Sequence, residues 1–190
     1  GQREIIDAVS SKKNVLAIMP TGGGKSLCFQ LPALMSEGLT VVISPLIALM
    51  RDQVRGLQAA GVAAGALTSG NTEDETDSVF SEIYAGTLKI LYVAPERLAS
   101  SAMQSALFRF NVTSLVVDEA HCVSQWGHDF RPDYLRIGEL RKSLGVPLAA
   151  FTATADKETR KEITERLFDG VVPKVFLHGF DRPNIYLSFA

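Results

Sequence analysis

Short apolar runs recur along the chain and predict β-strands. Most of them are continuously apolar, which is typical of strands that are buried on both faces of a parallel sheet. The predicted strands cover residues 15–19, 40–44, 88–93, 114–117, 148–152 and 175–178, and residues 62–67 form a weaker candidate.

Between these runs, apolar residues three or four positions apart predict helices. This spacing is found in Leu46, Met50, Val54 and Leu57, in Val79 with Ile83, in Phe80 with Tyr84, and in Ile163 with Leu167. Asp156 is the predicted N-cap of the last helix.

The alternation of strands and helices predicts an α/β fold of three layers, with a mostly parallel sheet and helices on both faces. Ligands bind such sheets at the carboxyl ends of the strands. We therefore expect ligand-binding or catalytic residues where the predicted strands end.

Composition narrows the class of protein. The chain has 190 residues, 46% of them hydrophobic and 21% charged, which suits one folded domain and argues against intrinsic disorder. Its net charge of −2 (19 basic against 21 acidic residues) argues against coating nucleic acid by bulk electrostatics, but not against holding it in a local groove.

The apolar runs and the two cysteines indicate where in the cell the protein is expected. No apolar run approaches the roughly 20 residues that cross a bilayer, and charged residues interrupt the first segment, so we expect an intracellular protein without membrane contact. Cys28 and Cys122 are far apart in sequence and predict reduced, buried thiols, with neither a disulfide nor a zinc site.

A glycine-rich segment, residues 19–26, follows the first predicted strand and opens a helix. Consecutive glycines at 22–24 let several backbone N–H groups point at one anion, and the helix N-terminus adds partial positive charge. Lys25 could then reach phosphates and Ser26 could bind Mg²⁺. Met19 stands where the strict phosphate-loop pattern has glycine. The alternative is a glycine-rich turn with a solvated lysine, and the order of strand, glycines, Lys-Ser and helix favours the phosphate site.

An acidic cluster, Asp118-Glu119-Ala120-His121, ends a later strand. A carboxylate beside a phosphate loop can hold Mg²⁺, and we assign this role to Asp118, through water. Glu119 would orient the attacking water. The alternative is a surface acidic pair followed by a chance histidine.

These segments resemble known helicase motifs. Residues 21–26, 118–121 and 152–154 look like motifs I, II and III of superfamily 2 helicases. Four further segments resemble RecQ-type DNA helicases: motifs Ia and Ib, the aromatic-rich loop after DEAH, and the end of the first RecA-like lobe, at residues 44–53, 94–98, 121–132 and 180–184. The resemblance implies a RecA-like P-loop NTPase lobe at 1–179, with 180–190 leading to an absent second lobe.

The resemblance also implies site residues for ATP and Mg²⁺. The implied catalytic residues are Lys25, Asp118, Glu119 and His121, and Ser26 and Asp118 are the implied metal ligands. Gln2 resembles the adenine-recognising glutamine of motif 0, although the residues that precede it in the family are missing here. The implied nucleotide-binding residues are Gln2, Thr21, Gly22, Gly23, Gly24, Lys25 and Ser26.

A second set of residues is implied to bind DNA or to couple DNA binding to hydrolysis. For several of them, the alternative is an ordinary loop between a strand and a helix. For Trp126 and Phe130, the alternative is burial in the core, although a polar, turn-rich stretch surrounds these two aromatics. Aromatics on a polar loop can stack on unpaired bases. The set is Ser44, Pro45, Leu46, Arg97, Trp126, His128, Phe130, Arg131, Thr152 and Thr154.

We therefore expect the parent protein to be an ATP-dependent helicase that moves 3′ to 5′ on single-stranded and partly duplex DNA, in the bacterial nucleoid or the nucleus. The family's arginine finger lies in the second lobe, so this lobe alone should be a poor ATPase and no helicase. Two alternatives remain: a superfamily 2 duplex translocase or RNA helicase, and a nucleotide-binding module that does not turn over.

Overall fold

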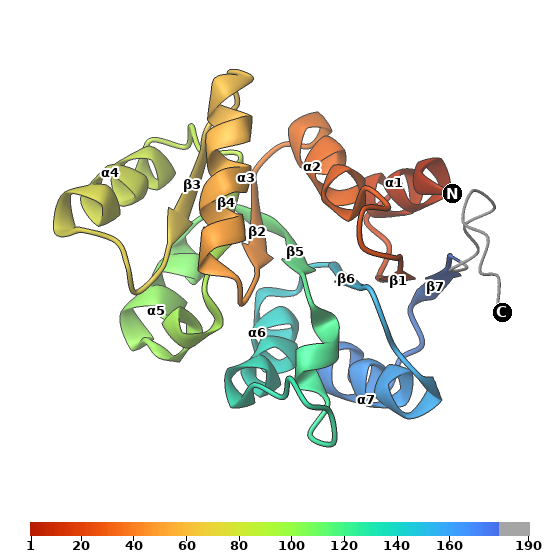
Figure 1. The fold of residues 1–190 in the computed structure, drawn as a ribbon. Coiled ribbons are helices and arrows are strands. Elements are labelled where there is room, and N and C mark those ends of the chain that lie inside the picture. Colours follow the sequence, from red (N-terminus) through yellow and green to blue (C-terminus); the bar gives the residue numbers. More distant parts are fainter. Residues whose placement is uncertain (179–190) are drawn as a thin grey trace, which may run out of the picture.

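The computed structural model describes residues 1–178. The predicted exit segment at 180–190 lies outside the described residues. One sheet holds seven strands in the order β3-β4-β2-β5-β6-β1-β7 (Figure 1). The strands are β1 (Val15–Ile18), β2 (Leu39–Ile43), β3 (Ala64–Leu67), β4 (Ile90–Val93), β5 (Val112–Val117), β6 (Leu148–Thr152) and β7 (Lys174–Leu177).

Every strand pairing in the described part of the chain is parallel, which confirms and sharpens the prediction of a mostly parallel sheet. Burial explains the continuous apolar runs. In β2, Val41 and Ile43 pack into one hydrophobic cluster, whereas Val42 between them packs into the other. Both faces of the strand are therefore buried away from solvent, so the residues that point to either face can be apolar.

The helices cover both faces of the sheet, as predicted (Figure 1). One face carries α1 (Gln2–Ser10), α2 (Lys25–Met35) and α3 (Ile47–Ala59). The other carries α4 (Glu73–Tyr84), α5 (Ser101–Arg109), α6 (Ile137–Leu144) and α7 (Lys157–Phe168). Three short 3₁₀ turns complete the described part: η1 (Pro95–Ala99), η2 (Ala120–Val123) and η3 (Pro132–Arg136).

Some local predictions hold and others need correction. The Asp156 side chain caps α7 by accepting a hydrogen bond from the Thr159 N–H, 2.7 Å away. Leu46, however, does not belong to the buried stripe of α3. It is the N-cap residue and is 43% exposed, because the helix begins one position later. Tyr84, at the end of α4, is also exposed.

Both cysteines are buried free thiols, as predicted. Burial raises the pKa of each thiol to about 11, so both stay protonated and unreactive near neutral pH.

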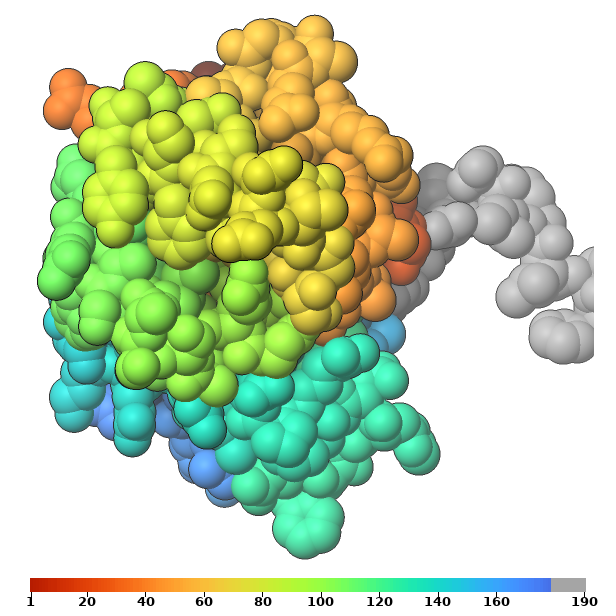
Figure 2. Space-filling model, turned by 90° about the vertical axis from the view of Figure 1, so that its left-hand side faces the viewer, coloured from red at the N-terminus to blue at the C-terminus, as the bar shows by residue number. Residues whose placement is uncertain are grey.

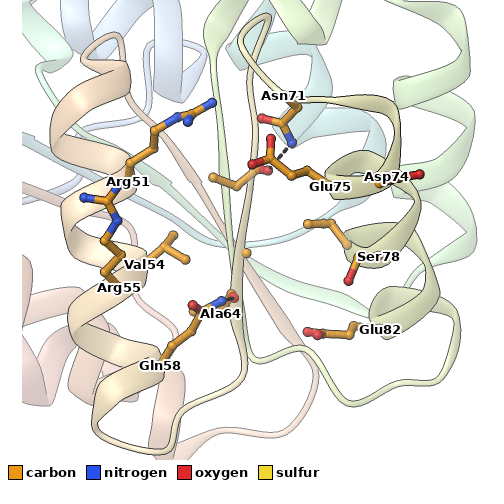
Figure 3. A pocket seen from close by; sticks show the side chains of 13 residues that line it. Arg51, Val54, Arg55, Gln58, Ala64, Asn71, Asp74, Glu75, Ser78 and Glu82 are labelled. Atoms are coloured by element: carbon orange, nitrogen blue, oxygen red, sulfur yellow. Dashed lines mark hydrogen bonds between the residues drawn. The ribbon is translucent and has the colours of Figure 1, made fainter.

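Strand β3 lies at an edge of the sheet, and a groove of about 460 Å³ runs beside it between α3 and α4 (Figure 3). Side-chain amides occupy the hydrogen-bonding positions along this edge. Gln58 donates to the Ala64 carbonyl at 2.9 Å, and Asn71 donates to the Ala66 carbonyl at 2.8 Å. These contacts protect the edge against pairing with another strand, and none of the groove-lining residues is a predicted site residue.

Candidate active site

The sheet order brings separate motifs together. Strands β5, β6 and β1 are neighbours, so their carboxyl ends lie side by side. The glycine-rich loop follows β1, Thr152 ends β6, and Asp118 follows β5. Residues more than a hundred positions apart in sequence thus meet at one edge, as expected for a parallel sheet.

The glycine-rich loop depends on backbone conformations that favour glycine. The Gly23 N–H donates to the Pro20 carbonyl at 2.9 Å and closes a turn in which Gly22 has φ of +82°. Gly24, the N-cap of α2, has φ of +77°, and a Cβ there would lie 1.9 Å from the Gln2 side chain. Met19 instead directly follows β1 and is buried in the core. The turn is therefore made by the later glycines, and the protein has no need of glycine at position 19.

Lys25 and Glu119 face one another across this edge. The Lys25 Nζ lies 3.9 Å from Glu119 Oε1, and the two side chains are 16% and 20% exposed. The long distance makes this a weak ion pair. Lys25 is thus held near the glycine loop by a partner that a bound phosphate, with its greater charge, would outcompete.

Asp118 has an environment suited to a cation. Its Oδ1 accepts the Glu119 N–H at 3.0 Å, and its own N–H donates to the Ile43 carbonyl at 2.8 Å. Burial, and then the charge of Glu119, raise the pKa of the Asp118 carboxyl above its usual value, whereas Lys25 opposes the shift. A nearby Mg²⁺ would favour the charged carboxylate.

Such a cation does not require a cage made only of protein. No group of three or more His, Cys, Asp or Glu side chains within residues 1–178 is arranged to hold a metal ion. In nucleotide sites Mg²⁺ is usually bound by one or two side chains together with phosphates and water. Asp118, which follows β5, and Ser26, in the first turn of the helix that follows β1, fit that arrangement.

The Glu119 backbone is strained. It has φ of +51° and ψ of +47°, the left-handed region, which costs a residue other than glycine roughly 1–2 kcal/mol. The other two described non-glycine residues with positive φ, Lys12 and Asp169, lie at the ends of helices, where this conformation is common. Glu119 instead directs its side chain toward Lys25, and strain of this kind is typical of functional sites.

His121 joins three parts of the site. Its Nδ1 lies 2.8 Å from the Thr152 hydroxyl and 3.3 Å from Glu119 Oε2, and its Nε2 lies 3.3 Å from the Asp129 carboxylate. The Thr152 hydroxyl donates to the Thr154 carbonyl at 2.9 Å. The acidic cluster, the segment after β6 and the loop beyond η2 are therefore in direct contact.

A partly buried network of side-chain hydrogen bonds reaches Ser26 from α3. Gln53 donates to the Ser26 hydroxyl at 2.8 Å, and its carbonyl oxygen accepts from Tyr92 at 2.9 Å and from Gln30 at 2.7 Å. Sequence reasoning assigned Gln53 no role, because no local pattern connects it to a residue 27 positions earlier. Its position within a motif-like segment was the one available signal.

Gln2 lies against the glycine-rich loop. It is the first residue of α1, and its amide nitrogen donates to the Gly23 carbonyl at 3.0 Å. Thr21, in the same loop, is exposed. The residues predicted to bind a nucleotide thus lie around one loop.

The residues after β2 and β4 are only partly arranged as predicted. Leu46, the N-cap residue of α3, provides no side-chain cap, which leaves backbone N–H groups of the first turn available for an anion. Ser44 is buried, and its hydroxyl has no partner among the described residues. The segment around Arg97, however, is a short 3₁₀ turn and not the start of an α-helix.

The loop that follows η2, residues 124–131, projects from the body of the protein (Figures 1 and 2). Trp126 is 89% exposed, so the alternative that it packs in the core is wrong. His128 and Arg131 are also exposed, and Phe130 is half-buried. The loop closes on itself, because the Arg131 N–H donates to the Cys122 carbonyl at 2.9 Å.

Comparison with known proteins connects these features to a family. Residues 1–163 match the family described as DEAD/DEAH box helicase. The chain is 49% identical to the ATP-dependent DNA helicase RecQ of Pasteurella multocida over 97% of this chain and 29% of that protein. It is 46% identical to the RecQ helicase of Haemophilus influenzae, over 97% of this chain and 30% of that protein. The chain thus spans about a third of the length of these relatives, and the resemblance to RecQ-type helicases is confirmed.

A solved structure supports the fold. The helicase domain of Hef from Pyrococcus furiosus superposes with a TM-score of 0.71 at 20% identity, covering 96% of this chain and 39% of that one. The predicted RecA-like helicase fold is confirmed.

Among the described residues, no helix is both long enough and apolar enough to cross a membrane.

Proposed function

The chain belongs to the DEAD/DEAH box helicase family, and we propose that it is the first motor lobe of a RecQ-type DNA helicase. In this proposal the whole enzyme couples hydrolysis of Mg-ATP to 3′–5′ movement on single-stranded DNA and to unwinding of duplex DNA, in the nucleoid or nucleus. The observation that carries the proposal is that Lys25, in the first turn of α2, meets Asp118, Glu119 and His121, which follow β5, at the carboxyl edge of the sheet.

The residues of this site divide the work of binding and hydrolysing ATP. The glycine-loop N–H groups and Lys25 hold the phosphates of ATP, and Gln2 approaches the same loop from α1. Ser26 and Asp118 would hold Mg²⁺, which when bound neutralises phosphate charge. Glu119 orients the water that attacks the terminal phosphate. Positioning and charge neutralisation are the main contributions of protein to phosphoryl transfer.

The DNA-contacting role belongs to the loops after β2 and β4 and to the loop at 124–131. Residues Ser44, Pro45, Leu46 and Arg97 lie on the first two, and Trp126, His128, Phe130 and Arg131 on the third. Contact between Asp129 and His121 gives DNA bound at this loop a short path to Glu119.

The chain itself corresponds to one lobe, residues 1–179. In this proposal the second half of the ATP cleft lies in a second lobe of the full-length protein, and the proposal is supported by the fact that the chain spans about a third of its relatives' length. The lobe alone is expected to hydrolyse ATP poorly and to unwind nothing.

The decisive experiment measures ATP hydrolysis by the full-length protein with single-stranded DNA, duplex DNA or RNA. Stimulation by single-stranded DNA is the expected result. Equal or greater stimulation by RNA or by duplex DNA would favour an RNA helicase or a duplex translocase. Tight ATP binding without turnover under all conditions would make the protein a nucleotide-dependent binding module.

Replacing Gln53 with leucine should raise the Mg²⁺ concentration needed for half-maximal ATPase activity by about tenfold, as is typical when a residue that orients a metal ligand is lost. The Gln53 amide orients the Ser26 hydroxyl, so its loss leaves that ligand free to rotate. The same shift should appear in Mg²⁺-dependent binding of a fluorescent ATP analogue. Gln58→Leu, on the same helix but facing the sheet edge, is the control. An unchanged Mg²⁺ midpoint would argue against this role.

Replacing Trp126 with alanine should uncouple hydrolysis from DNA more than it weakens DNA binding. Loss of one stacking contact costs about 1–3 kcal/mol, and phosphate contacts elsewhere retain part of the affinity. We expect ATPase activity at saturating single-stranded DNA to fall close to the DNA-free rate, measured beside a binding isotherm at the same salt. Tyr84→Ala removes another exposed aromatic as a control. Full stimulation at saturating DNA would make Trp126 a simple DNA contact.

A further inference from the structure

We propose that Glu162, on α7, is a positioning residue that holds the loop at 124–131 in the orientation needed to transmit DNA binding. This inference rests on the proposed function, because it concerns the loop that couples DNA to hydrolysis. Neither the motif pattern nor the sequence analysis assigns Glu162 a role.

One carboxylate holds two consecutive residues at the start of the loop. The Ser124 hydroxyl donates to Glu162 Oε1 at 2.7 Å, and the Gln125 N–H donates to Glu162 Oε2 at 3.0 Å. Ser124 is buried, whereas Gln125 and Trp126 are exposed. The anchor therefore lies where the chain leaves the core, directly before the tryptophan.

Other contacts fix the remainder of the loop base. The Arg131 N–H donates to the Cys122 carbonyl at 2.9 Å, and the buried Tyr134 hydroxyl donates to the Asp118 carbonyl at 3.0 Å. The first bond joins the end of the loop to η2, and the second joins η3, which follows the loop, to the residue that follows β5. The two Glu162 hydrogen bonds join the start of the loop to α7, the helix that also packs against η2.

Helix α7 holds the loop close to the residues that connect it to the candidate active site. The helix begins shortly after Thr152 and Thr154, and Asp156 caps its N-terminus. Thr152 in turn contacts His121, which also contacts Asp129 within the loop. A loop held at its base can pass a displacement of its tip to His121 through Asp129, whereas a loose loop would absorb the same displacement.

The strength of the anchor comes from its charge. An ionised carboxylate offers two acceptor oxygens, and it accepts from the Ser124 hydroxyl and from the Gln125 N–H. Hydrogen bonds to a charged acceptor are roughly twice as strong as neutral ones. In Glu162→Gln, a nearly isosteric change, the Ser124 hydroxyl can rotate to accept from the new NH₂ group, but both bonds become neutral and are weakened.

The first test uses the full-length protein with the Glu162→Gln variant. We expect stimulation of ATPase by saturating single-stranded DNA to fall by about fivefold or more, the effect of roughly 1 kcal/mol lost at one anchored contact. The DNA-free ATPase rate and the KM for ATP should stay within about twofold of the unmodified enzyme. Glu165→Gln, an exposed position on the same helix, is the matched control. Full stimulation of the Glu162→Gln enzyme would overturn the inference.

The second test needs neither ATP nor DNA. Trp126 is the only tryptophan in this chain, so its time-resolved fluorescence anisotropy reports the order of the loop directly. Glu162→Gln should add fast local motion of the tryptophan that the unmodified chain and Glu165→Gln lack, with an unchanged melting temperature. Ser124→Ala, which removes only one of the two bonds, should give an intermediate effect. Identical anisotropy decays in all variants would refute the anchor.

The two tests separate the inference from the proposed function. If the unmodified full-length enzyme shows no stimulation by DNA, the proposed function fails, and the anisotropy result still decides whether Glu162 orders the loop. If the enzyme is stimulated normally and the Glu162→Gln enzyme is too, only the positioning role is refuted.

Discussion

Replacing Lys25 with alanine is expected to abolish ATP hydrolysis by the full-length enzyme, with a loss of at least about a hundredfold, typical of removing one preorganised charge from a reacting centre. Within the glycine-rich loop, Lys25 is the one residue whose side chain carries a charge to the phosphates. The side chain is only 16% exposed, so solvent cations would replace it poorly. A steady-state ATPase assay with saturating DNA measures the effect.

The fold should survive this substitution. The Lys25 side chain contributes only a long, weak ion pair with Glu119, and alanine is a good helix former at the start of α2. Circular dichroism and a melting curve would check this. Lys13→Ala, an exposed lysine close to the same loop in sequence, is the control and should leave turnover unchanged. Normal turnover by Lys25→Ala would rule out the phosphate site.

Replacing Glu119 with glutamine is expected to separate binding from chemistry. The variant should bind Mg-ATP with nearly unchanged affinity but lose hydrolysis by about a hundredfold or more, within the range for removal of a catalytic base. Glutamine keeps the shape of the side chain, and the left-handed backbone at this position strains both residues to a similar extent. It cannot, however, accept a proton from water. Asp118, which serves the cation, is untouched.

Titration with a fluorescent ATP analogue, followed by single-turnover hydrolysis, makes this measurement. Glu158→Gln, exposed on α7, is the control for the change of charge. If the Glu119→Gln enzyme failed to bind Mg-ATP, then Glu119 rather than Asp118 would serve the metal, and the two assigned roles would be exchanged.

These predictions depend on different kinds of information in the chain. The sequence by itself determined the strands, several of the helices and the local chemistry of the glycine-rich loop. Continuous apolar runs identified all seven strands, including the weak candidate that became β3. In the central strands, burial on both faces leaves this signature, whereas the edge strand β7 is largely exposed and was identified from its apolar residues alone. The glycines at 22–24 predicted the turn before α2, because positive φ at Gly22 and Gly24 is a local backbone property.

The helices at 2–10, 101–109 and 137–144 were not among the predicted stripes. Each is a short helix, and only two or three of its residues are buried, so the apolar spacing is too brief to be recognised. The exposed start of α3 at Leu46 was similarly invisible, because a periodic pattern does not mark the position at which a helix begins.

Only the tertiary structure decided which strand ends meet. Hydrophobic periodicity records whether a residue is buried but not against what, so nothing local states that β6 lies between β5 and β1. That order places Thr152 beside His121. Because periodicity does not record such contacts, the sequence could not predict that Gln53 contacts Ser26 or that Glu162 contacts Ser124, which is 38 positions away. Contacts between distant residues arise from packing of the whole sheet and its helices, and the physical cause of this site's geometry therefore lies in the folded chain.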